Sequence, residues 1–398
     1  MDITITPQKL SGSVTAIPSK SQAHRLLICA AFADRPTTLL CPDTNRDIEA
    51  TADCLNALGA KITRTDWGYS VTPVQALPEK ALLNCCESGS TLRFLLPVAG
   101  ALGVDATFLM AGRLPQRPLS PLWEEMERMG CTLTRPTSET IRCQGKLKAG
   151  EYVIDGSVSS QFITGLLLAT ALIPGESHIR LVGKVESRPY ITMTQRAMAV
   201  FGMDTEAFSV QGGKPFHSPG TVTVEGDWSN GAFFLAAQSL GNEVTTHNLS
   251  PDSPQGDRAA AELLPALDEN ITISAADIPD LVPILSVVAA CKQGAVFTDI
   301  RRLRLKESDR VASVVAMLEN LGGRAEATED TLTVYGTGLT GGTVDSVNDH
   351  RIAMSAAIAA TVCKEHVTIL GAECVKKSYP HFWAEYARLG GKYEQYLR

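Results

Sequence analysis

The sequence is short of positive charge, of aromatic residues and of long apolar runs. Its 36 Lys and Arg are outnumbered by 43 Asp and Glu, for a formal net charge of −7, and 6% of its residues are aromatic. An acidic chain is a poor general binder of nucleic acid or of anionic membranes. The apolar stretch 94–110 is broken by Pro97 and Asp105, and the stretch 281–291 is too short to span a bilayer. We expect neither a nucleic-acid nor a membrane partner, so any anion site must be a local cluster.

Targeting and metal-binding patterns are also missing. The opening residues MDITITPQKL have no basic segment followed by an apolar one, so no signal peptide is predicted. The ten cysteines form no CxxC pair, which predicts reduced, buried thiols in a cytoplasmic protein. The seven histidines show no metal-ligand spacing, so no metal site is predicted.

One glycine motif resembles a dinucleotide-binding loop but lacks its context. The segment GTGLTG, residues 336–341, matches GxGxxG and follows an expected strand. The next residues, Gly342 to Asp345, are strand-like, and no helix is expected there to receive a pyrophosphate. The sequence therefore argues against a nicotinamide cofactor.

What the sequence does contain is a repeated change from helix to strand. A chain of 398 residues favours two domains. Amphipathic segments end in Gly, the residue expected just after a helix, at Gly59, Gly130, Gly202, Gly322 and Gly390. A further change without Gly falls near 264–267, which gives six units of about 65 residues. Chance remains an alternative, because Leu-Gly is common at helix ends.

The fold class is predicted from alternating strand and helix patterns. Segments 151–155, 221–226, 331–336 and 366–370 have strand character, and segments 21–33, 159–172 and 349–363 have helical spacing. These indicate an α/β or α+β fold in which sheets cover buried helices.

Polar and basic residues gather where helices are expected to begin. Helix N-termini attract anions, and added Lys, Arg and Ser strengthen such sites. For one segment, capping by Ser, Asn or Asp is the simpler interpretation, but capping does not explain basic residues there. The segments are PSKSQAHR (18–25), ESGSTLR (87–93), GSVSSQ (156–161), ESRPY (186–190), KESDR (306–310), NDHR (348–351) and KKSYP (376–380). Together they predict a site for small, multiply anionic ligands.

The stretch RLRLKESDR, residues 302–310, combines four cations with two carboxylates. Leu303 and Leu305 alternate with charged residues, so we expect a strand with one buried face. Glu307 would then open a helix that brings it close to Lys306 and Arg310.

In order along the chain, SKSQAHR, RPLSPL, GSVSSQF, IPD, KESDR, NDHR and KKSYP resemble the 5-enolpyruvylshikimate-3-phosphate (EPSP) synthase family of enolpyruvyl transferases. The resemblance implies a two-domain inside-out α/β barrel, each domain being three βαβαββ units with buried helices. It implies one domain of residues 1–18 and 226–398, a second of residues 19–225, and an active site in the cleft between them.

The same resemblance implies transfer of the enolpyruvyl group of phosphoenolpyruvate to the 5-hydroxyl of shikimate 3-phosphate, with release of phosphate, by a cytoplasmic monomer without a metal or organic cofactor. By match of motifs, the phosphoenolpyruvate contacts are Lys20, Gly89, Arg117, Gln161, Arg310, Arg351 and Lys377. The shikimate 3-phosphate contacts are Lys20, Ser21, Arg25, Ser159, Ser160, Gln161, Ser187, Asp280 and Lys306.

By the same resemblance, Asp280 and Glu307 match the family's two acidic catalytic positions, and Lys20 is the third residue that we expect to transfer a proton. Carboxylates set among cations can both move protons and stabilise a developing positive charge. We assign Lys20 and Glu307 to the methylene carbon and Asp280 to the 5-hydroxyl. The alternatives are a helix cap at Asp280 and a first-turn dipole partner at Glu307.

The sequence departs from the family pattern at two places. Arg302 stands where Asn is usual, which puts one shikimate-phosphate contact in doubt. ESGSTLRF, residues 87–94, replaces the more common NAGTAMRP. Two other functions remain as alternatives: transfer of enolpyruvate to UDP-N-acetylglucosamine, whose enzymes carry a Cys in the loop that reads GRLPQRP here (112–118), and binding of a phosphosugar without catalysis.

Overall fold

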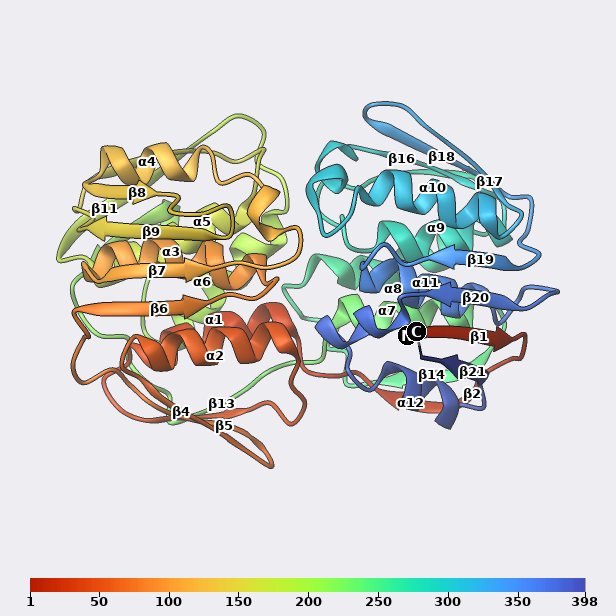
Figure 1. The fold of residues 1–398 in the computed structure, drawn as a ribbon, viewed down its shortest axis with the longest axis horizontal. Helices are drawn as coiled ribbons and strands as arrows, with labels where there is room; N and C mark the ends of the chain where they lie inside the picture. The colour runs from red at the N-terminus through yellow and green to blue at the C-terminus, as the bar shows by residue number, and fades with distance from the viewer. Residues whose placement is uncertain (398) are drawn as a thin grey trace. The chain divides into compact units, whose positions relative to one another are not determined.

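The computed structural model describes residues 1–397, apart from the side chain of Glu206. The chain forms two compact units (Figure 1). The central unit comprises Pro18–Glu225, and the terminal unit comprises Met1–Ile17 with Gly226–Arg398. Each unit is described by itself below.

The central unit contains three sheets, with strand orders β13-β3-β5-β4, β6-β7-β9-β8 and β10-β11-β12. Its strands are β3 (Thr37–Leu40), β4 (Lys61–Thr65), β5 (Gly68–Thr72), β6 (Lys80–Asn84), β7 (Asp105–Leu109), β8 (Cys131–Thr134), β9 (Thr140–Gly145), β10 (Glu151–Asp155), β11 (Gly175–Val182), β12 (Ser209–Gly212) and β13 (Thr221–Thr223). Its helices are α1 (Lys20–Ala31), α2 (Arg46–Ala57), α3 (Gly89–Leu102), α4 (Leu122–Arg128), α5 (Ser160–Leu172) and α6 (Arg188–Val200), with short 3-10 turns η1 (Leu114–Gln116) and η2 (Glu206–Phe208).

The terminal unit also contains three sheets, ordered β19-β20-β1-β21, β15-β16-β18-β17 and β14-β2. Its strands are β1 (Asp2–Thr6), β2 (Ser11–Thr15), β14 (Glu243–His247), β15 (Ile271–Ser274), β16 (Ala295–Thr298), β17 (Arg324–Ala327), β18 (Thr331–Tyr335), β19 (Gly342–Asp345), β20 (Val367–Leu370) and β21 (Lys392–Tyr396). Its helices are α7 (Trp228–Ser239), α8 (Ala260–Ala266), α9 (Val282–Cys291), α10 (Arg310–Asn320), α11 (His350–Ala359) and α12 (Phe382–Arg388), with η3 (Gly256–Ala259), η4 (Arg301–Leu305) and η5 (Ala372–Lys377).

Sheets in the two units repeat one strand order. In the sheet β6-β7-β9-β8, β6 and β7 are parallel, and β9 pairs antiparallel with β7. In the sheet β15-β16-β18-β17, β15 and β16 are parallel, and β18 pairs antiparallel with β16. A helix follows each of the first two strands, which is the strand–helix–strand–helix–strand–strand unit. In β19-β20-β1-β21 the N-terminal strand β1 takes the position beside the second strand, so both ends of the chain join one sheet.

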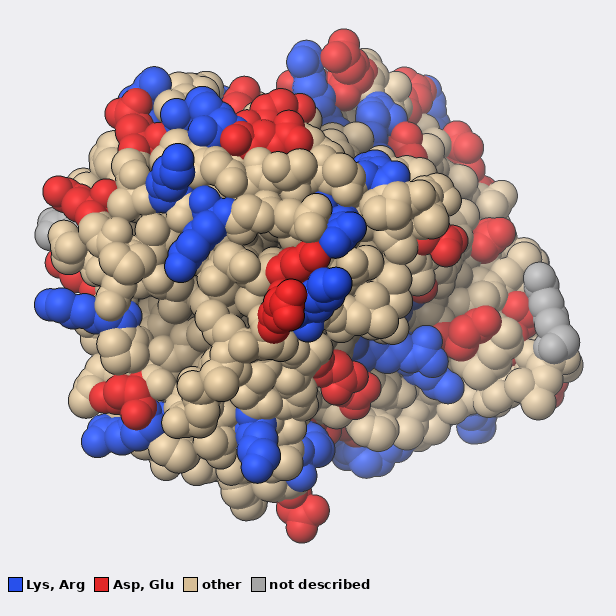
Figure 2. Space-filling model, turned by 60° about the vertical axis from the view of Figure 1, so that its left-hand side comes forward, with Lys and Arg blue, Asp and Glu red and all other residues tan. Residues whose placement is uncertain are grey.

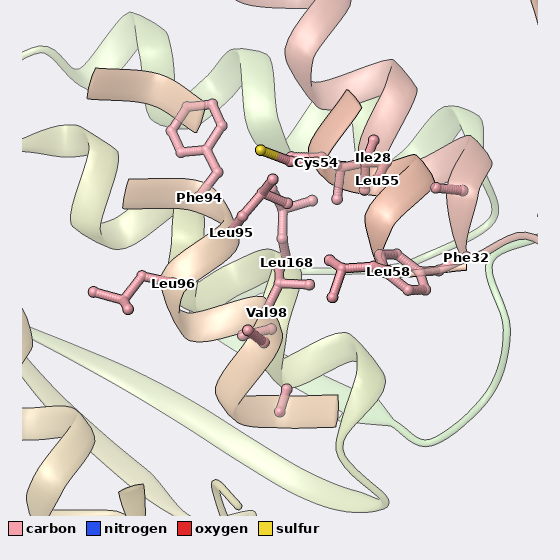
Figure 3. Close-up of a cluster of buried hydrophobic side chains, with 14 of the residues drawn as sticks. Ile28, Phe32, Cys54, Leu55, Leu58, Phe94, Leu95, Leu96, Val98 and Leu168 are labelled. Atoms are coloured by element: carbon pink, nitrogen blue, oxygen red, sulfur yellow. The ribbon is translucent and has the colours of Figure 1, made fainter. Parts of the chain in front are cut away.

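Helices form the interior of each unit, as the sequence predicted. All ten residues of α11 and nine of the ten in α9 are buried. In the central unit, Figure 3 shows Leu95 of α3, Leu55 of α2 and Leu168 of α5 gathered in one core. After His350 and Arg351, the residues of α11 are nearly all apolar, as are those of α9, because sheets and other helices, rather than water, surround them. The predicted α/β class with buried helices is confirmed.

The predicted changes from helix to strand are confirmed as well. Gly59, Gly130, Gly202, Gly322 and Gly390 all have positive φ, between 73° and 118°. Residues 264–267 lie where α8 ends before β15, without a glycine. Gly342–Asp345 after the GTGLTG motif is strand β19, so no helix receives a dinucleotide there.

Two local predictions are wrong. Residues 301–305 form the 3-10 turn η4, and Leu305 is 47% exposed. The preceding strand β16 ends at Thr298, and Asp299 has φ of 58°, a left-handed conformation that turns the chain away from the sheet. The thiols are free, but Cys86 is exposed and Cys291 is only partly buried.

No helix among the described residues is long and apolar enough to cross a membrane.

The closest packing between buried helices gives a first prediction. A Cβ on Gly165 of α5 would lie 2.2 Å from the Arg93 carbonyl oxygen and 2.7 Å from Pro97 Cγ of α3, so the α3 backbone must move. We expect Gly165→Ala to destabilise the protein by about 1–3 kcal/mol, the usual range for overpacking. Gly100→Ala is the matched control, because its Cβ would meet the flexible side chains of Cys131 and Met126. Urea unfolding of both variants measures the difference, and equal costs would contradict the backbone clash.

Candidate functional site

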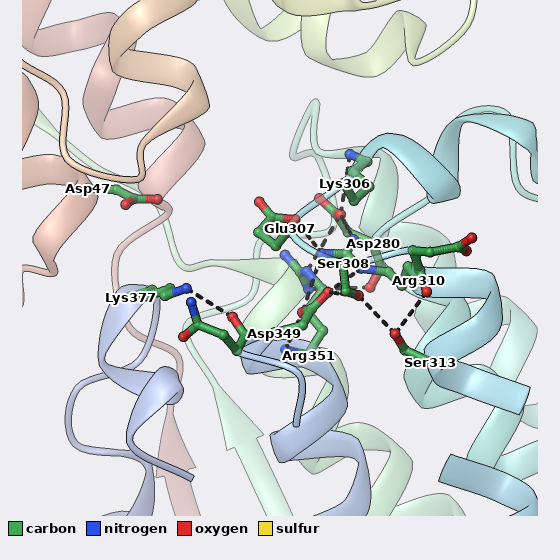
Figure 4. Close-up of polar contacts among 12 residues, drawn as sticks. Asp47, Asp280, Lys306, Glu307, Ser308, Arg310, Ser313, Asp349, Arg351 and Lys377 are labelled. Atoms are coloured by element: carbon green, nitrogen blue, oxygen red, sulfur yellow. Dashed lines mark hydrogen bonds and ion pairs between the residues drawn. The ribbon is translucent and has the colours of Figure 1, made fainter. Parts of the chain in front are cut away.

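The terminal unit holds a buried cluster of charges around Arg310, which is 1% exposed (Figure 4). Its Nη1 donates to Asp280 Oδ1 at 2.7 Å, and its Nη2 donates to Glu307 Oε2 at 2.6 Å. Its Nε donates to Asp349 Oδ2 at 3.0 Å. Burial alone would lower the pKa of Arg310, but the three carboxylates hold it above its usual value. One guanidinium thus organises three carboxylates.

Asp280 receives further cations. Arg351 Nε lies 3.5 Å and Lys306 Nζ lies 3.6 Å from Asp280 Oδ1. Arg351 Nη1 also donates to the Asp280 carbonyl oxygen at 3.3 Å. The residue at the N-cap position of α9 is Leu281, so the alternative interpretation of Asp280 as a helix cap is wrong.

Two aspartates begin the helices that carry these cations. Asp309 caps α10 by accepting from Ala312 N at 3.1 Å, which places Arg310 at the first helical position. Asp349 caps α11 by accepting from Arg351 N at 2.9 Å. Burial alone would raise the pKa of Asp349, but Arg310 holds it below its usual value. Glu307 precedes α10 rather than opening it, so its predicted place in a first helical turn is wrong.

Lys306 and Lys377 lie at the edge of this cluster. The Lys306 side chain is 21% exposed, and burial lowers its pKa to about 8 in spite of Asp280. Lys377 Nζ donates to the Asn348 carbonyl oxygen at 2.9 Å, just before α11. Lys377 is the last residue of the 3-10 turn η5 and does not begin a helix. At the C-terminal end of a helical turn, a cation interacts favourably with the dipole.

Sequence reasoning missed one buried carboxylate beside this cluster. Asp257 is 2% exposed and accepts a hydrogen bond from Ser229 Oγ. Its Oδ1 is buried with no hydrogen-bond partner among the described residues. Burial, followed by repulsion from Asp280, raises the pKa of Asp257 to about 7, and Arg351 opposes that rise. Asp257 stands in a short 3-10 turn, and no sequence pattern distinguished it from a surface acid.

The central unit holds the other predicted residues, beginning with an ion pair at two helix starts. Lys20 is the first residue of α1, and its Nζ donates to Asp47 Oδ2 at 2.9 Å. Asp47 lies in the first turn of α2, which Asn45 caps. The two side chains are 17% and 18% exposed. Asp47 was not predicted, although an acid just after an Asn cap is a usual first-turn residue.

Gly89 makes room for an arginine. It begins α3, and a Cβ at this position would lie 2.7 Å from Arg117 Nη1. Any larger residue would therefore displace the guanidinium. Gln161 of α5 accepts from Arg93 Nη1 at 2.7 Å and donates to Ser90 Oγ at 3.0 Å, which ties the starts of α3 and α5 together.

Arg25 is buried among neutral oxygens. Its Nε donates to Thr194 Oγ1 at 2.8 Å, and its Nη1 donates to the Ser21 carbonyl at 2.6 Å. Its Cζ lies 5.0 Å above the centre of the Phe94 ring. Burial lowers the pKa of Arg25 to about 10. Ser159, Ser160 and Ser187 are also buried, at the starts of α5 and α6.

The structure thus groups the predicted residues within each unit. Lys20, Ser21, Arg25, Gly89, Arg117, Ser159, Ser160, Gln161 and Ser187 belong to the central unit, and Asp280, Lys306, Glu307, Arg310, Arg351 and Lys377 belong to the terminal unit. The described residues contain no group of three or more His, Cys, Asp and Glu that could hold a metal. On the face in Figure 2, Lys and Arg are interspersed with Asp and Glu rather than gathered in one basic area.

Comparison with known proteins gives one consistent result. The family model described as EPSP synthase (3-phosphoshikimate 1-carboxyvinyltransferase) matches residues 5–275 and 267–386. Proteins named 3-phosphoshikimate 1-carboxyvinyltransferase from Clostridium beijerinckii and Clostridium kluyveri are each 36% identical to the chain. Each match covers 99% of this chain, and it covers 99% of the Clostridium beijerinckii protein and 98% of the Clostridium kluyveri protein. A structure of EPSP synthase from Acinetobacter baumannii matches the fold with a TM-score of 0.81 at 23% identity, covering all of both chains.

The Arg310 cluster gives a second prediction. Arg310→Ala leaves three carboxylates without their shared cation, and losing one partner of a buried ion pair costs about 3–5 kcal/mol. We therefore expect a large fall in the free energy of unfolding of this variant. Arg301→Ala is the control, since Arg301 is 65% exposed and its acidic partners lie 3.6 Å and 3.7 Å away. That change should cost less than about 1 kcal/mol. Denaturant unfolding compares the two, and similar losses would contradict the cluster's role.

Asp257 gives a prediction for pH. Its folded pKa of about 7 exceeds the usual unfolded value of about 4, so the folded state holds the proton more tightly. The stability this group contributes is full below pH ~4 and is lost as the pH rises toward ~7. Asp257→Asn removes that loss, so its melting temperature should rise relative to the parent between pH 5 and pH 8. The exposed Asp66→Asn is the control, and a constant difference for Asp257→Asn would contradict the assignment.

Proposed function

The chain belongs to the EPSP synthase family, and on this premise we propose that it transfers the enolpyruvyl group of phosphoenolpyruvate to the 5-hydroxyl of shikimate 3-phosphate and releases phosphate. This is the reaction of a 3-phosphoshikimate 1-carboxyvinyltransferase in the shikimate pathway to chorismate and the aromatic amino acids. The observation that carries the proposal is the buried Arg310, which holds Asp280 and Glu307 beside Lys306.

The proposed reaction moves protons at two sites, the methylene carbon of phosphoenolpyruvate and the 5-hydroxyl oxygen. In the addition step, a proton joins the methylene carbon while the 5-hydroxyl oxygen bonds to the adjacent carbon and loses its proton. In the elimination step, phosphate leaves and a proton leaves the methyl carbon, which restores the double bond. We assign the carbon-bound proton to Glu307 and Lys20, and the hydroxyl proton to Asp280. Between the two steps Asp280 holds the hydroxyl proton, and the cation beside Glu307 stabilises the anion left when Glu307 gives its proton.

The remaining assignments follow the charge of the two substrates. We propose Lys20, Gly89, Arg117, Gln161, Arg310, Arg351 and Lys377 for phosphoenolpyruvate, and Lys20, Ser21, Arg25, Ser159, Ser160, Gln161, Ser187, Asp280 and Lys306 for shikimate 3-phosphate. Because these residues divide between the two units, we also propose that each unit is a domain and that the active site forms between them. The cations at helix starts support these substrate assignments, since phosphates and carboxylates bind well at such positions.

Two wider properties belong to the same proposal. We propose that the enzyme works as a monomer in the cytoplasm. Ten free cysteines among the described residues fit a reducing compartment.

Phosphate release tests the function. The purified protein should release phosphate when phosphoenolpyruvate and shikimate 3-phosphate are both present, and not with either alone. UDP-N-acetylglucosamine in place of shikimate 3-phosphate distinguishes the related transferase. Release with that acceptor, or binding of shikimate 3-phosphate without any turnover, would contradict the proposed reaction.

The proton-transfer role of Glu307 gives a separate prediction. Glu307→Gln keeps the size and the neighbour Arg310 but cannot exchange a proton. We expect kcat to fall by about 10²–10⁴-fold, the usual contribution of an acid–base group, while the Kd for shikimate 3-phosphate changes only a few-fold. The control is Glu329→Gln, because Glu329 is 79% exposed. A loss of less than about tenfold in kcat would instead make Glu307 a charge partner of Arg310.

A further inference from the structure

A chain of buried polar side chains runs beneath the starts of three helices in the central unit. His24 Nδ1 lies 2.7 Å from Thr51 Oγ1, and Thr51 Oγ1 lies 2.7 Å from Thr91 Oγ1. Thr91 Oγ1 donates to Ser88 Oγ at 2.7 Å. His24 and the two threonines are fully buried, and Ser88 is 1% exposed. The four residues belong to α1, to α2, to α3 and to the N-cap of α3.

The direction of these hydrogen bonds follows from Thr91, whose Oγ1 can donate to Ser88 Oγ at 2.7 Å or to the Asp47 carbonyl oxygen at 3.4 Å. When Thr91 donates to Ser88, Thr51 donates to Thr91 and His24 Nδ1–H donates to Thr51, because each hydroxyl has a single proton. Burial, then repulsion from Lys20 and Arg25, lowers the pKa of His24 well below its usual value, so His24 is neutral. Its Nε2 is buried with no partner among the described residues.

The members of the chain stand close to Lys20, to its partner Asp47 and to Gly89. His24 lies one helical turn after Lys20 on α1, and Thr51 lies one turn after Asp47 on α2. Thr91 Oγ1 lies 3.4 Å from the Asp47 carbonyl oxygen. Ser88 directly precedes Gly89, whose missing side chain admits the Arg117 guanidinium. A buried hydrogen-bond chain restrains the relative positions of the elements that it joins.

The segment ESGSTLRF, residues 87–94, supplies two members of the chain, Ser88 and Thr91, whose hydroxyls form these bonds. Phe94 of the same segment packs edge-on against the His24 ring, with 6.2 Å between the ring centres, and lies beneath Arg25.

We infer that His24, Thr51, Thr91 and Ser88 form a positioning relay: they hold the first turns of α1, α2 and α3 together, and so set the Lys20–Asp47 pair and the Gly89–Arg117 contact that receive phosphoenolpyruvate. The inference rests on the proposed function. None of the four touches the reacting atoms in this account, so they act through Lys20 and Arg117.

Paired variants of Thr91 test the relay. Thr91→Val keeps the shape but removes the hydroxyl, whereas Thr91→Ser keeps the hydroxyl. For Thr91→Val, we expect kcat/KM for phosphoenolpyruvate to fall about five- to thirty-fold, the usual effect of breaking one buried hydrogen bond. The KM for shikimate 3-phosphate should rise less than the KM for phosphoenolpyruvate: Lys20, Ser21 and Arg25 on α1 are shared with the relay, but its contacts on α5 and α6 lie outside it. Thr91→Ser should stay within about twofold of the parent in both. If both KM values rise by the same factor, or Thr91→Ser is as impaired as Thr91→Val, the inference is wrong.

A second pair tests whether the bonds form one chain. Thr51→Val should show the same fall in kcat/KM for phosphoenolpyruvate as Thr91→Val, and Thr51→Ser should not. This pair also tests the relay if Thr91→Val fails to fold. Either change breaks the same chain of hydrogen bonds. The kcat/KM for phosphoenolpyruvate of the double Thr51→Val, Thr91→Val variant should therefore be little lower than that of the worse single variant. Losses that multiply would show two independent contacts and would overturn the relay.

A measurement that does not depend on turnover tests the relay separately from the proposed function. If the parent protein shows no turnover with both substrates, the proposed reaction fails, and the relay is then read from the rate at which an amine-acylating reagent labels Lys20. Faster labelling in Thr91→Val than in the parent and in Thr91→Ser would support the relay. Equal rates in the three proteins would overturn it.

Discussion

The contact of Arg310 with three carboxylates is the interaction on which the terminal unit's site depends. A guanidinium with 1% exposure is costly to bury unless anions surround it. Here the anions come from three separate places: the segment before α9, the loop before α10 and the cap of α11. The electrostatic need of one residue therefore fixes Asp280 and Glu307 relative to each other. In the proposed reaction protons move at the methylene carbon and at the 5-hydroxyl oxygen, and a fixed spacing of the two carboxylates would serve both sites.

Two buried arginines of the central unit are satisfied in a different way, whereas Lys20 is paired with the Asp47 carboxylate. Arg25 is held by hydroxyls and carbonyls, and Arg93 by the amide oxygen of Gln161 and the carbonyl of Pro118. Neutral oxygens satisfy the hydrogen-bonding needs of a guanidinium without cancelling its charge. An incoming phosphate thus meets positive charge there, whereas in the terminal unit it must share Arg310 with carboxylates. We infer that the central unit contributes attraction for the phosphates together with Lys20, and that the terminal unit contributes the two acid–base carboxylates.

The sequence predicted the motifs, the buried helices and the helix ends, because hydrophobic periodicity and Gly at left-handed positions are local signals. It failed where tertiary context decided the outcome. Residues 301–305 alternate like a strand, yet the left-handed turn at Asp299 removes them from the sheet. Asp47 gains its importance from Lys20, which is distant in sequence, and Asp257 from burial beside Asp280. The His24 chain joins three helices. No window of sequence contains such contacts.

One polar residue at a helix start can both cap the helix and hold a neighbouring side chain. Asp349 caps α11 through Arg351 N and also binds Arg310. Ser88 caps α3 through Thr91 N and also ends the chain that begins at His24. Because the cap fixes where the helix begins, the same side chain sets the backbone and aligns the charged groups beside it. A helix start that is held from both sides is preorganised, so little free energy is then spent on ordering it when an anion binds.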